Sequence, residues 1–168
     1  MSLPLLPIDP IPEETARIAH AAFPKGTLYL TIRDELGTIY TNETFADLFP
    51  AVGQPALAPW RLALVTVFQF KEGLSDRQAA DAVRSRIDWK YALGLSLSDA
   101  GFDASVLSEF RARLLAHEAG ERLLDVLLEQ CKAHGWLKAG GRQRTDSTHV
   151  LAAIRLLNRL ELVGETLR

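Results

Sequence analysis

The sequence predicts a mainly α-helical protein, built around a small helical domain of the helix-turn-helix kind. Three observations lead to this fold class. All eight prolines lie at or before position 59, so no proline breaks a helix after that point. Apolar residues recur at helical spacing in several later segments, and three of these segments end on a glycine. With 48% hydrophobic residues, a chain of 168 residues can bury a sizeable core.

The N-terminal part is predicted to hold an extended arm, a short helix and a small β element. Four prolines within the first 12 residues favour extended backbone, and a helix is predicted over 13–23. Residues 27–40 alternate apolar and polar side chains around Gly37, which indicates a strand or a small hairpin. Residues 42–49 begin with an asparagine cap and contain one or two helical turns.

Five helices are predicted after residue 58. The first begins at Pro59 and ends before Gly73, and the second opens with a capping box made by Ser75 and Gln78. The other three are predicted over 86–94, 103–117 and 120–135.

Three domains are expected: an arm and short helix over 1–26, a helical domain over 27–138 and a third segment over 139–168. Cys131 is the single cysteine, so no internal disulfide can form. The N-terminus lacks the pattern of a signal peptide, and the longest apolar run is too short to span a bilayer. We expect a cytoplasmic protein without a membrane partner.

The net charge of −2 argues weakly against nucleic-acid binding. The charge is uneven, however, because residues 1–58 sum to −4 and residues 59–168 to +2. Any affinity for DNA must therefore come from the local placement of basic side chains.

The helices after residue 74 carry the candidate DNA-binding residues. The second and third are short, are joined by a tight link and contain small residues that allow close crossing, as in helix-turn-helix units. On the fourth, two serines face outward while two arginines flank the apolar stripe, a pattern that suits a major groove and its phosphates. The candidates are Arg77, Arg84, Arg86, Lys90, Ser105, Ser108, Arg111 and Arg113. The alternative is that these are ordinary solvated helices whose arginine stems cover apolar surface.

Asp146 is the candidate catalytic residue. It lies in GGRQRTDSTHV, a β-type run in which it shares one face with Arg144 and Thr148. A carboxylate on a rigid strand can place a divalent metal, although one aspartate does not make a Mg²⁺ site alone. The alternative is a cap or turn residue at a strand end.

Three segments in this order resemble the N-terminal part of a bacterial insertion-sequence transposase. They are LAPWRLALVTVFQFKEGLSDRQAADAVRSRIDWKYALGLSL, FDASVLSEFRARL and GRQRTDSTHVLAAIRLLNRLELVGETL. The chain is similar to an InsH-like N-terminal domain followed by the start of a DDE-class, RNase H-like core.

The resemblance implies a bacterial, nucleoid-associated protein with a function in DNA transposition. In such enzymes the helical domain is expected to bind the terminal inverted repeats of the element as double-stranded DNA. Two aspartates and a glutamate of the core hold Mg²⁺, and Asp146 matches the first of these aspartates.

Only 22 residues follow Asp146, so the second aspartate and the glutamate are missing. We expect a chain that is catalytically incomplete alone and needs no cofactor by itself. One alternative is half of a split or frameshifted transposase, completed by a missing catalytic half. Another is a non-catalytic interaction module or inert remnant, for which a homodimer is possible.

Overall fold

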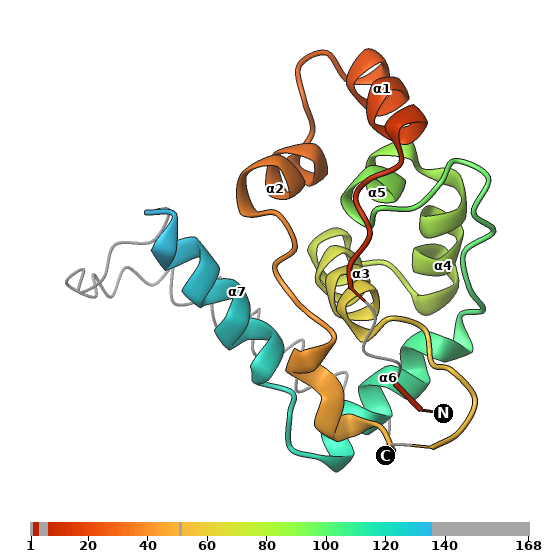
Figure 1. Cartoon of the computed structure of the whole chain (residues 1–168), viewed down its shortest axis with the longest axis vertical. Helices are drawn as coiled ribbons and strands as arrows, with labels where there is room; N and C mark the ends of the chain where they lie inside the picture. Colours follow the sequence, from red (N-terminus) through yellow and green to blue (C-terminus); the bar gives the residue numbers. More distant parts are fainter. Residues whose placement is uncertain (1, 4–6, 51, 136–168) are drawn as a thin grey trace. The chain divides into compact units, whose positions relative to one another are not determined.

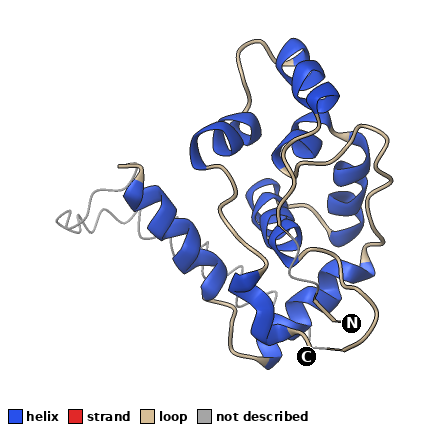
Figure 2. Cartoon of the chain, in the orientation of Figure 1, coloured by secondary structure: helices blue, strands red, loops and turns tan. Residues whose placement is uncertain are grey.

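The computed structural model describes residues 2–3, 7–50 and 52–135 (Figures 1 and 2). The chain divides into two compact units, Met1–Leu137 and Lys138–Arg168, and the described residues belong to the first. These residues form seven α-helices and one 3₁₀ helix, as follows: α1 (Glu13–Ala22), α2 (Leu28–Leu36), η1 (Glu43–Leu48), α3 (Pro59–Glu72), α4 (Asp76–Ser85), α5 (Ile87–Ala92), α6 (Ser105–Ala116) and α7 (Arg122–Ala133). The mainly α fold class is therefore confirmed. None of the described helices is long and apolar enough to cross a membrane.

The predicted β element is wrong, because its residues form α2. The side chain of Thr27 caps this helix by accepting a hydrogen bond from the backbone N–H of Leu30. Gly37 ends it with a positive φ of 63°, so this glycine marks a helix end rather than a hairpin turn. One side of α2 is buried against α5. This packing decides whether the short apolar pattern forms a helix or a strand. Within the described residues, the isolated bridge Ser2–Pro55 is the only β pairing.

The other predicted helices are confirmed, with small changes at their ends. Pro59 is the first residue of α3, and Gly73 follows its last turn in the left-handed conformation. Ser75 and Gln78 form both hydrogen bonds of the predicted capping box at the start of α4. Residues 43–48 form a 3₁₀ helix, and the predicted cap Asn42 makes no capping hydrogen bond with its side chain.

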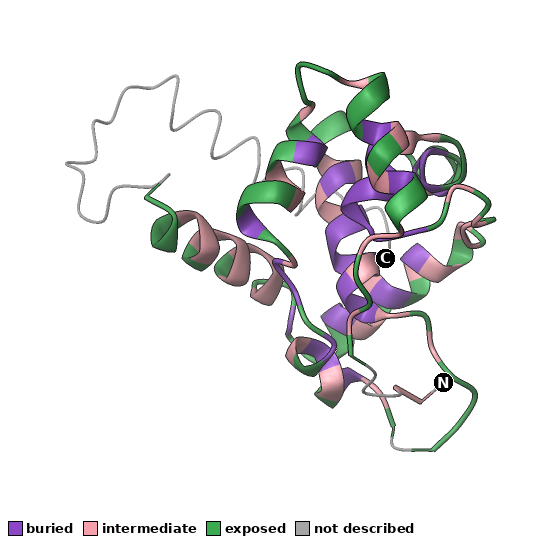
Figure 3. Ribbon diagram, turned by 45° about the horizontal axis from the view of Figure 1, so that its top comes forward, coloured by how far each residue is buried: buried purple, intermediate pink, exposed green. Residues whose placement is uncertain are grey.

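The core lies along α3 and the helices that pack around it (Figure 3). An aromatic group stands at its centre, where the Phe68 and Trp89 rings lie 5.3 Å apart and the Tyr29 ring stands edge-on to Phe68 at 4.6 Å. These contacts tie α2, α3 and α5 together. Helices α4 and α6 each pack one face against the core and expose the other face.

Helix α7 is joined to the segment around η1. The hydroxyl of Tyr40 donates to the backbone oxygen of Leu123 at 2.7 Å. Arg122 pairs with Asp47 at 2.6 Å and also donates to the carbonyl of Thr44. The helix has no fully buried residue, but its half-buried Leu123, Val126 and Leu127 pack against the core beside these polar contacts.

Candidate nucleic-acid interface

Helices α3, α4 and α6 pack against one another and form the scaffold of the candidate interface (Figure 1). The buried face of α4 consists of small residues, namely Ala79, Ala80, Ala82 and Val83. Because these side chains are short, the neighbouring backbone approaches closely. Gly101 lies there with φ +71°, and a Cβ on it would stand 3.7 Å from the carbonyl oxygen of Ala80 and 3.6 Å from the nitrogen of Arg84. The chain thus turns tightly beside α4 before α6 begins.

Helix α6 buries one stripe and exposes another. Leu107, Phe110 and Leu114 are buried, whereas Ser105, Glu109 and Ala112 are exposed, as the helical pattern predicted. The backbone N–H of Ser105 donates to Asp103 at 2.9 Å, which fixes the start of the helix. The hydroxyl of Ser108 donates to the carbonyl of Ser105 at 2.7 Å, so its oxygen remains available as an acceptor.

Arg77 and Arg84 lie seven residues apart on the exposed side of α4, and both are close to the beginning of α6. Arg84 is 57% exposed; it pairs with Asp81 at 3.3 Å and donates to the carbonyl of Ala100 at 3.1 Å. The backbone hydrogen bond from Ser105 mainly lowers the pKa of Asp103. The positive charge of Arg77 lowers this pKa a little further. A solvent-exposed pair such as Arg84–Asp81 is weak, so both guanidinium groups can reach a phosphate.

Arg111 holds α6 to the other two helices and faces inward. Its guanidinium pairs with Asp76 at 2.6 Å and contacts Gln69 at 3.5 Å, and the side chain is 18% exposed. Gln69 in turn donates to Asp76 at 2.7 Å. Burial raises the pKa of Asp76, but the hydrogen bonds from Arg111 and Gln69 outweigh it, so the pKa falls below its usual value. We therefore assign Arg111 to the fold rather than to a DNA contact.

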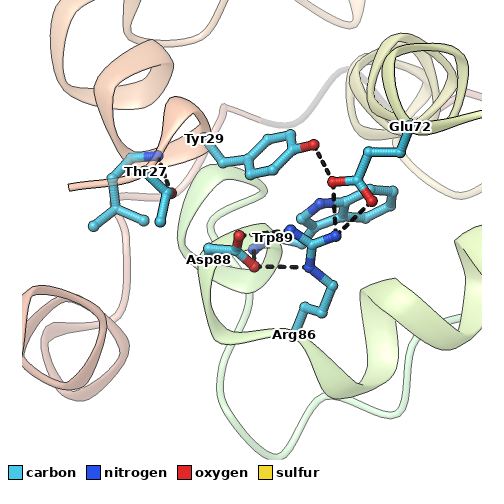
Figure 4. A network of polar contacts seen from close by, with 7 residues as sticks. Thr27, Tyr29, Glu72, Arg86, Asp88 and Trp89 are labelled. Carbon is cyan, nitrogen blue, oxygen red and sulfur yellow. Dashed lines mark hydrogen bonds and ion pairs between the residues drawn. The ribbon is translucent and has the colours of Figure 1, made fainter. Parts of the chain in front are cut away.

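Arg86 is also occupied by the fold (Figure 4). It donates to Glu72 at 2.7 Å and forms a fork with Asp88 at 2.7 and 3.0 Å. Its guanidinium lies 5.1 Å from the ring centroids of both Tyr29 and Trp89. Tyr29 also donates to Oε1 of Glu72, and burial together with this hydrogen bond raises the pKa of Tyr29 to about 12. Moving Arg86 to a phosphate would leave Asp88, a buried carboxylate, without its partner.

Lys90 is buried, and its predicted role as a DNA contact does not fit its position. The residue is 3% exposed, and its ammonium donates to the carbonyls of Asp99 at 2.5 Å and Ser96 at 3.4 Å. Burial lowers its pKa. All residues of α5 except Ile87 are buried, so this helix has no free face for a groove. In a helix-turn-helix unit of this domain, the helix that enters the groove would therefore be α6 and not α5.

Arg113 stays available on the other edge of α6. Its guanidinium lies 5.1 Å from the centroid of the Phe49 ring, with no ion pair to a described carboxylate. The position of Arg113 agrees with the predicted flank of the apolar stripe. Of the eight candidates, Arg77, Arg84, Arg113 and the two serines therefore lie at or near the surface, although Arg84 contacts Asp81 and Ala100 and both serine hydroxyls make hydrogen bonds at the start of α6.

Sequence reasoning missed one basic pair. Arg33 and Arg61 both lie beside the ring of Trp60, with guanidinium carbons 5.8 and 5.0 Å from its centroid. The sequence does not predict this pair, because its pattern assigns Arg33 to a strand, far from the start of α3.

The candidate catalytic residue Asp146 lies outside the described residues. Within residues 2–135, apart from the gaps at 4–6 and 51, no three His, Cys, Asp or Glu side chains are grouped so that they could hold a metal ion.

Comparison with protein families gives one match. The family described as Transposase domain (DUF772) matches residues 18–113, which extend from α1 to the last turns of α6. No curated protein and no solved structure matches the chain significantly.

Proposed function

The chain belongs to this family of transposase domains, which indicates a role in transposition, and from that premise we propose that its helical domain binds duplex DNA through α4 and α6. The observation that supports the proposal is the exposed polar surface at the start of α6. Arg84 reaches the loop just before this helix, Arg77 lies close to Asp103, and the hydroxyl of Ser105 is exposed.

This surface suits a duplex in two ways. Arginines on α4 can each hold a phosphate, while the small side chains of α6 allow the helix to approach the base edges closely. Arg113 on the far edge of α6 can hold a third phosphate. Three acidic side chains, Asp81, Asp103 and Glu109, lie on or beside the same surface, so weak non-specific binding and a dependence on well-placed contacts are expected.

The proposed target is the terminal inverted repeat of the mobile element, as the resemblance to insertion-sequence transposases implies. Residues 136–168 carry six Lys and Arg against three Asp and Glu, and this positive excess adds to the attraction for DNA. Asp146 as the first catalytic carboxylate, Mg²⁺ as its metal, and a homodimer or a missing catalytic half as partner all remain proposals from the same resemblance.

The experiment that tests DNA binding compares matched variants by fluorescence anisotropy. A labelled duplex that carries an element end from the DNA flanking the gene is titrated with the full chain, and a scrambled duplex serves as the reference. Arg77→Ala and Arg84→Ala together should weaken binding at low salt, because each loses a phosphate contact. Lys71→Ala is the control, since Lys71 is exposed at the end of α3 and outside the surface. Equal affinity of the double variant and the wild type would refute the assignment of this surface.

A further inference from the structure

Arg33, on α2, is an arginine without a counter-ion. Its guanidinium makes no hydrogen bond or ion pair with any described residue, although the side chain is partly buried. Its Nη1 atom is buried and has no hydrogen-bond partner. Its Nη2 atom points towards Gly94, where a Cβ would stand 3.8 Å away. The described neighbours thus leave the positive charge of Arg33 without a paired acceptor, which is unusual for a partly buried guanidinium.

Arg61, at the beginning of α3, brings a second positive charge to the same place. Its Nε donates to the carbonyl of Leu93 at 2.9 Å and its Nη2 to the carbonyl of Gly94 at 3.4 Å. These bonds cap the C-terminal end of α5 and leave Nη1 of Arg61 without a protein acceptor. Both guanidinium groups lie beside the Trp60 ring, at 5.8 and 5.0 Å.

The charges around the pair are only partly balanced. Burial mainly lowers the pKa of Arg33, and the charge of Arg61 lowers it further. Asp34 acts on Arg33, and Asp9 and Asp99 act on Arg61, but none of these carboxylates is within ion-pair distance. Asp34 accepts a hydrogen bond from the Tyr91 hydroxyl, so part of its charge is already used. Two neighbouring guanidinium groups thus share a half-buried site.

We propose that Arg33 and Arg61, held against Trp60, form a binding site for a phosphate group. A phosphate oxygen can accept from Nη2 of Arg33 while a second oxygen accepts from Nη1 of Arg61, and the fixed planar forks favour this geometry over a single point charge. The carbonyls of Leu93 and Gly94 hold Arg61 in place before the ligand arrives, and the indole ring lies beside both guanidinium groups. The phosphate can come from a DNA backbone or from a small phosphorylated molecule. The DNA source rests on the function proposed above, whereas the site itself does not.

The test follows the side-chain N–H groups of arginine in the full-length chain. The Nε–Hε cross-peaks of Arg33 and Arg61 are recorded by NMR during a titration with inorganic phosphate at constant ionic strength. Both cross-peaks should shift and saturate, and Arg33→Gln should weaken the affinity about tenfold through the loss of a charge-assisted contact. The matched control is Arg17→Gln, on an exposed position of α1, which should leave the titration unchanged. If neither cross-peak of the wild type saturates, or if both variants bind phosphate equally well, the site is refuted.

A second titration with duplex DNA separates the two sources. If Arg33→Gln also weakens duplex binding, the ligand is a backbone phosphate. If duplex affinity is unchanged while phosphate binding is lost, the ligand is a small phosphorylated molecule, and the site still stands. If the wild type binds phosphate at Arg33 but no DNA at all, the proposed function fails and the phosphate site remains. Circular dichroism of each variant confirms that a loss of binding is not a loss of fold.

Discussion

Replacement of Arg111 by methionine distinguishes a residue of the fold from a residue of the DNA surface. Methionine keeps most of the apolar stem but removes the charge that pairs with Asp76 at 2.6 Å. Asp76, whose side chain is 28% exposed, then keeps only the hydrogen bond from Gln69. Breaking a fully buried pair costs about 3–5 kcal/mol, and partial exposure of both side chains reduces this to about 2 kcal/mol.

The assay is urea unfolding followed by circular dichroism. With a slope of about 2 kcal/mol per molar urea, the midpoint of Arg111→Met should fall by about 1 M relative to the wild type. Arg77→Met is the control, because Arg77 is exposed and its midpoint should not change. The reasoning would be refuted if Arg111→Met kept the wild-type midpoint but bound DNA more weakly.

The same variant carries a pH dependence whose sign follows from Asp76. The hydrogen bonds from Arg111 and Gln69 hold the folded pKa of Asp76 below its unfolded value, which is about 3.9. The resulting stabilisation is therefore fully present above that unfolded value and is lost as the pH falls through the lower folded pKa. The difference in unfolding free energy between wild type and Arg111→Met should be largest near neutral pH and should shrink at a pH of about 3 or below.

Three further changes test other contacts of the scaffold by the same urea assay. Lys90→Met should destabilise the fold by about 1–3 kcal/mol, because it leaves the carbonyl of Asp99 without its lysine donor; wild-type stability would show that water replaces the lysine. Gly101→Ala should cost about 1 kcal/mol through its positive φ of 71°, since an added Cβ meets only ordinary contacts. Ser75→Ala should cost about 1 kcal/mol through the loss of the capping box, and an unchanged midpoint would mean that Gln78 alone caps α4.

The sequence was sufficient for the helices whose ends carry their own signals. Pro59 and Gly73 bound α3, and the capping box opens α4, because these are local effects that do not depend on the rest of the fold. The pattern of α2 was misread, since an alternation of apolar residues over nine positions fits a strand as well as a helix. Its packing on α5 decides the outcome, and such packing is not visible in the sequence.

The roles of the basic residues were less predictable than the helices. On a helical pattern, Arg111 and Arg113 look alike as flanks of one apolar stripe. The structure separates them because Asp76 comes from another helix and meets Arg111, while Arg113 meets the ring of Phe49. The sequence predicts Lys90 as a surface residue of a short helix, whereas in the structure the loop after α5 covers it.

Because the fold itself holds some of the arginines and Lys90, fewer basic side chains on the described surface remain to contact phosphates. Their number limits how strongly DNA binding by this surface depends on salt concentration. If Arg77, Arg84 and Arg113 are its phosphate contacts, three counterions are released, and the logarithm of the binding constant should fall with the logarithm of salt concentration with a slope of about −2.7. Involvement of Arg33 would add about −0.9 to this slope, and Arg33→Gln would remove that addition. A much steeper slope would require additional contacts, either from other exposed basic residues such as Lys25, Lys71 and Lys132 or from residues 136–168, whose charge excess is positive. Comparing the slopes of the wild type and Arg33→Gln therefore measures whether Arg33 is among the residues that contact the duplex.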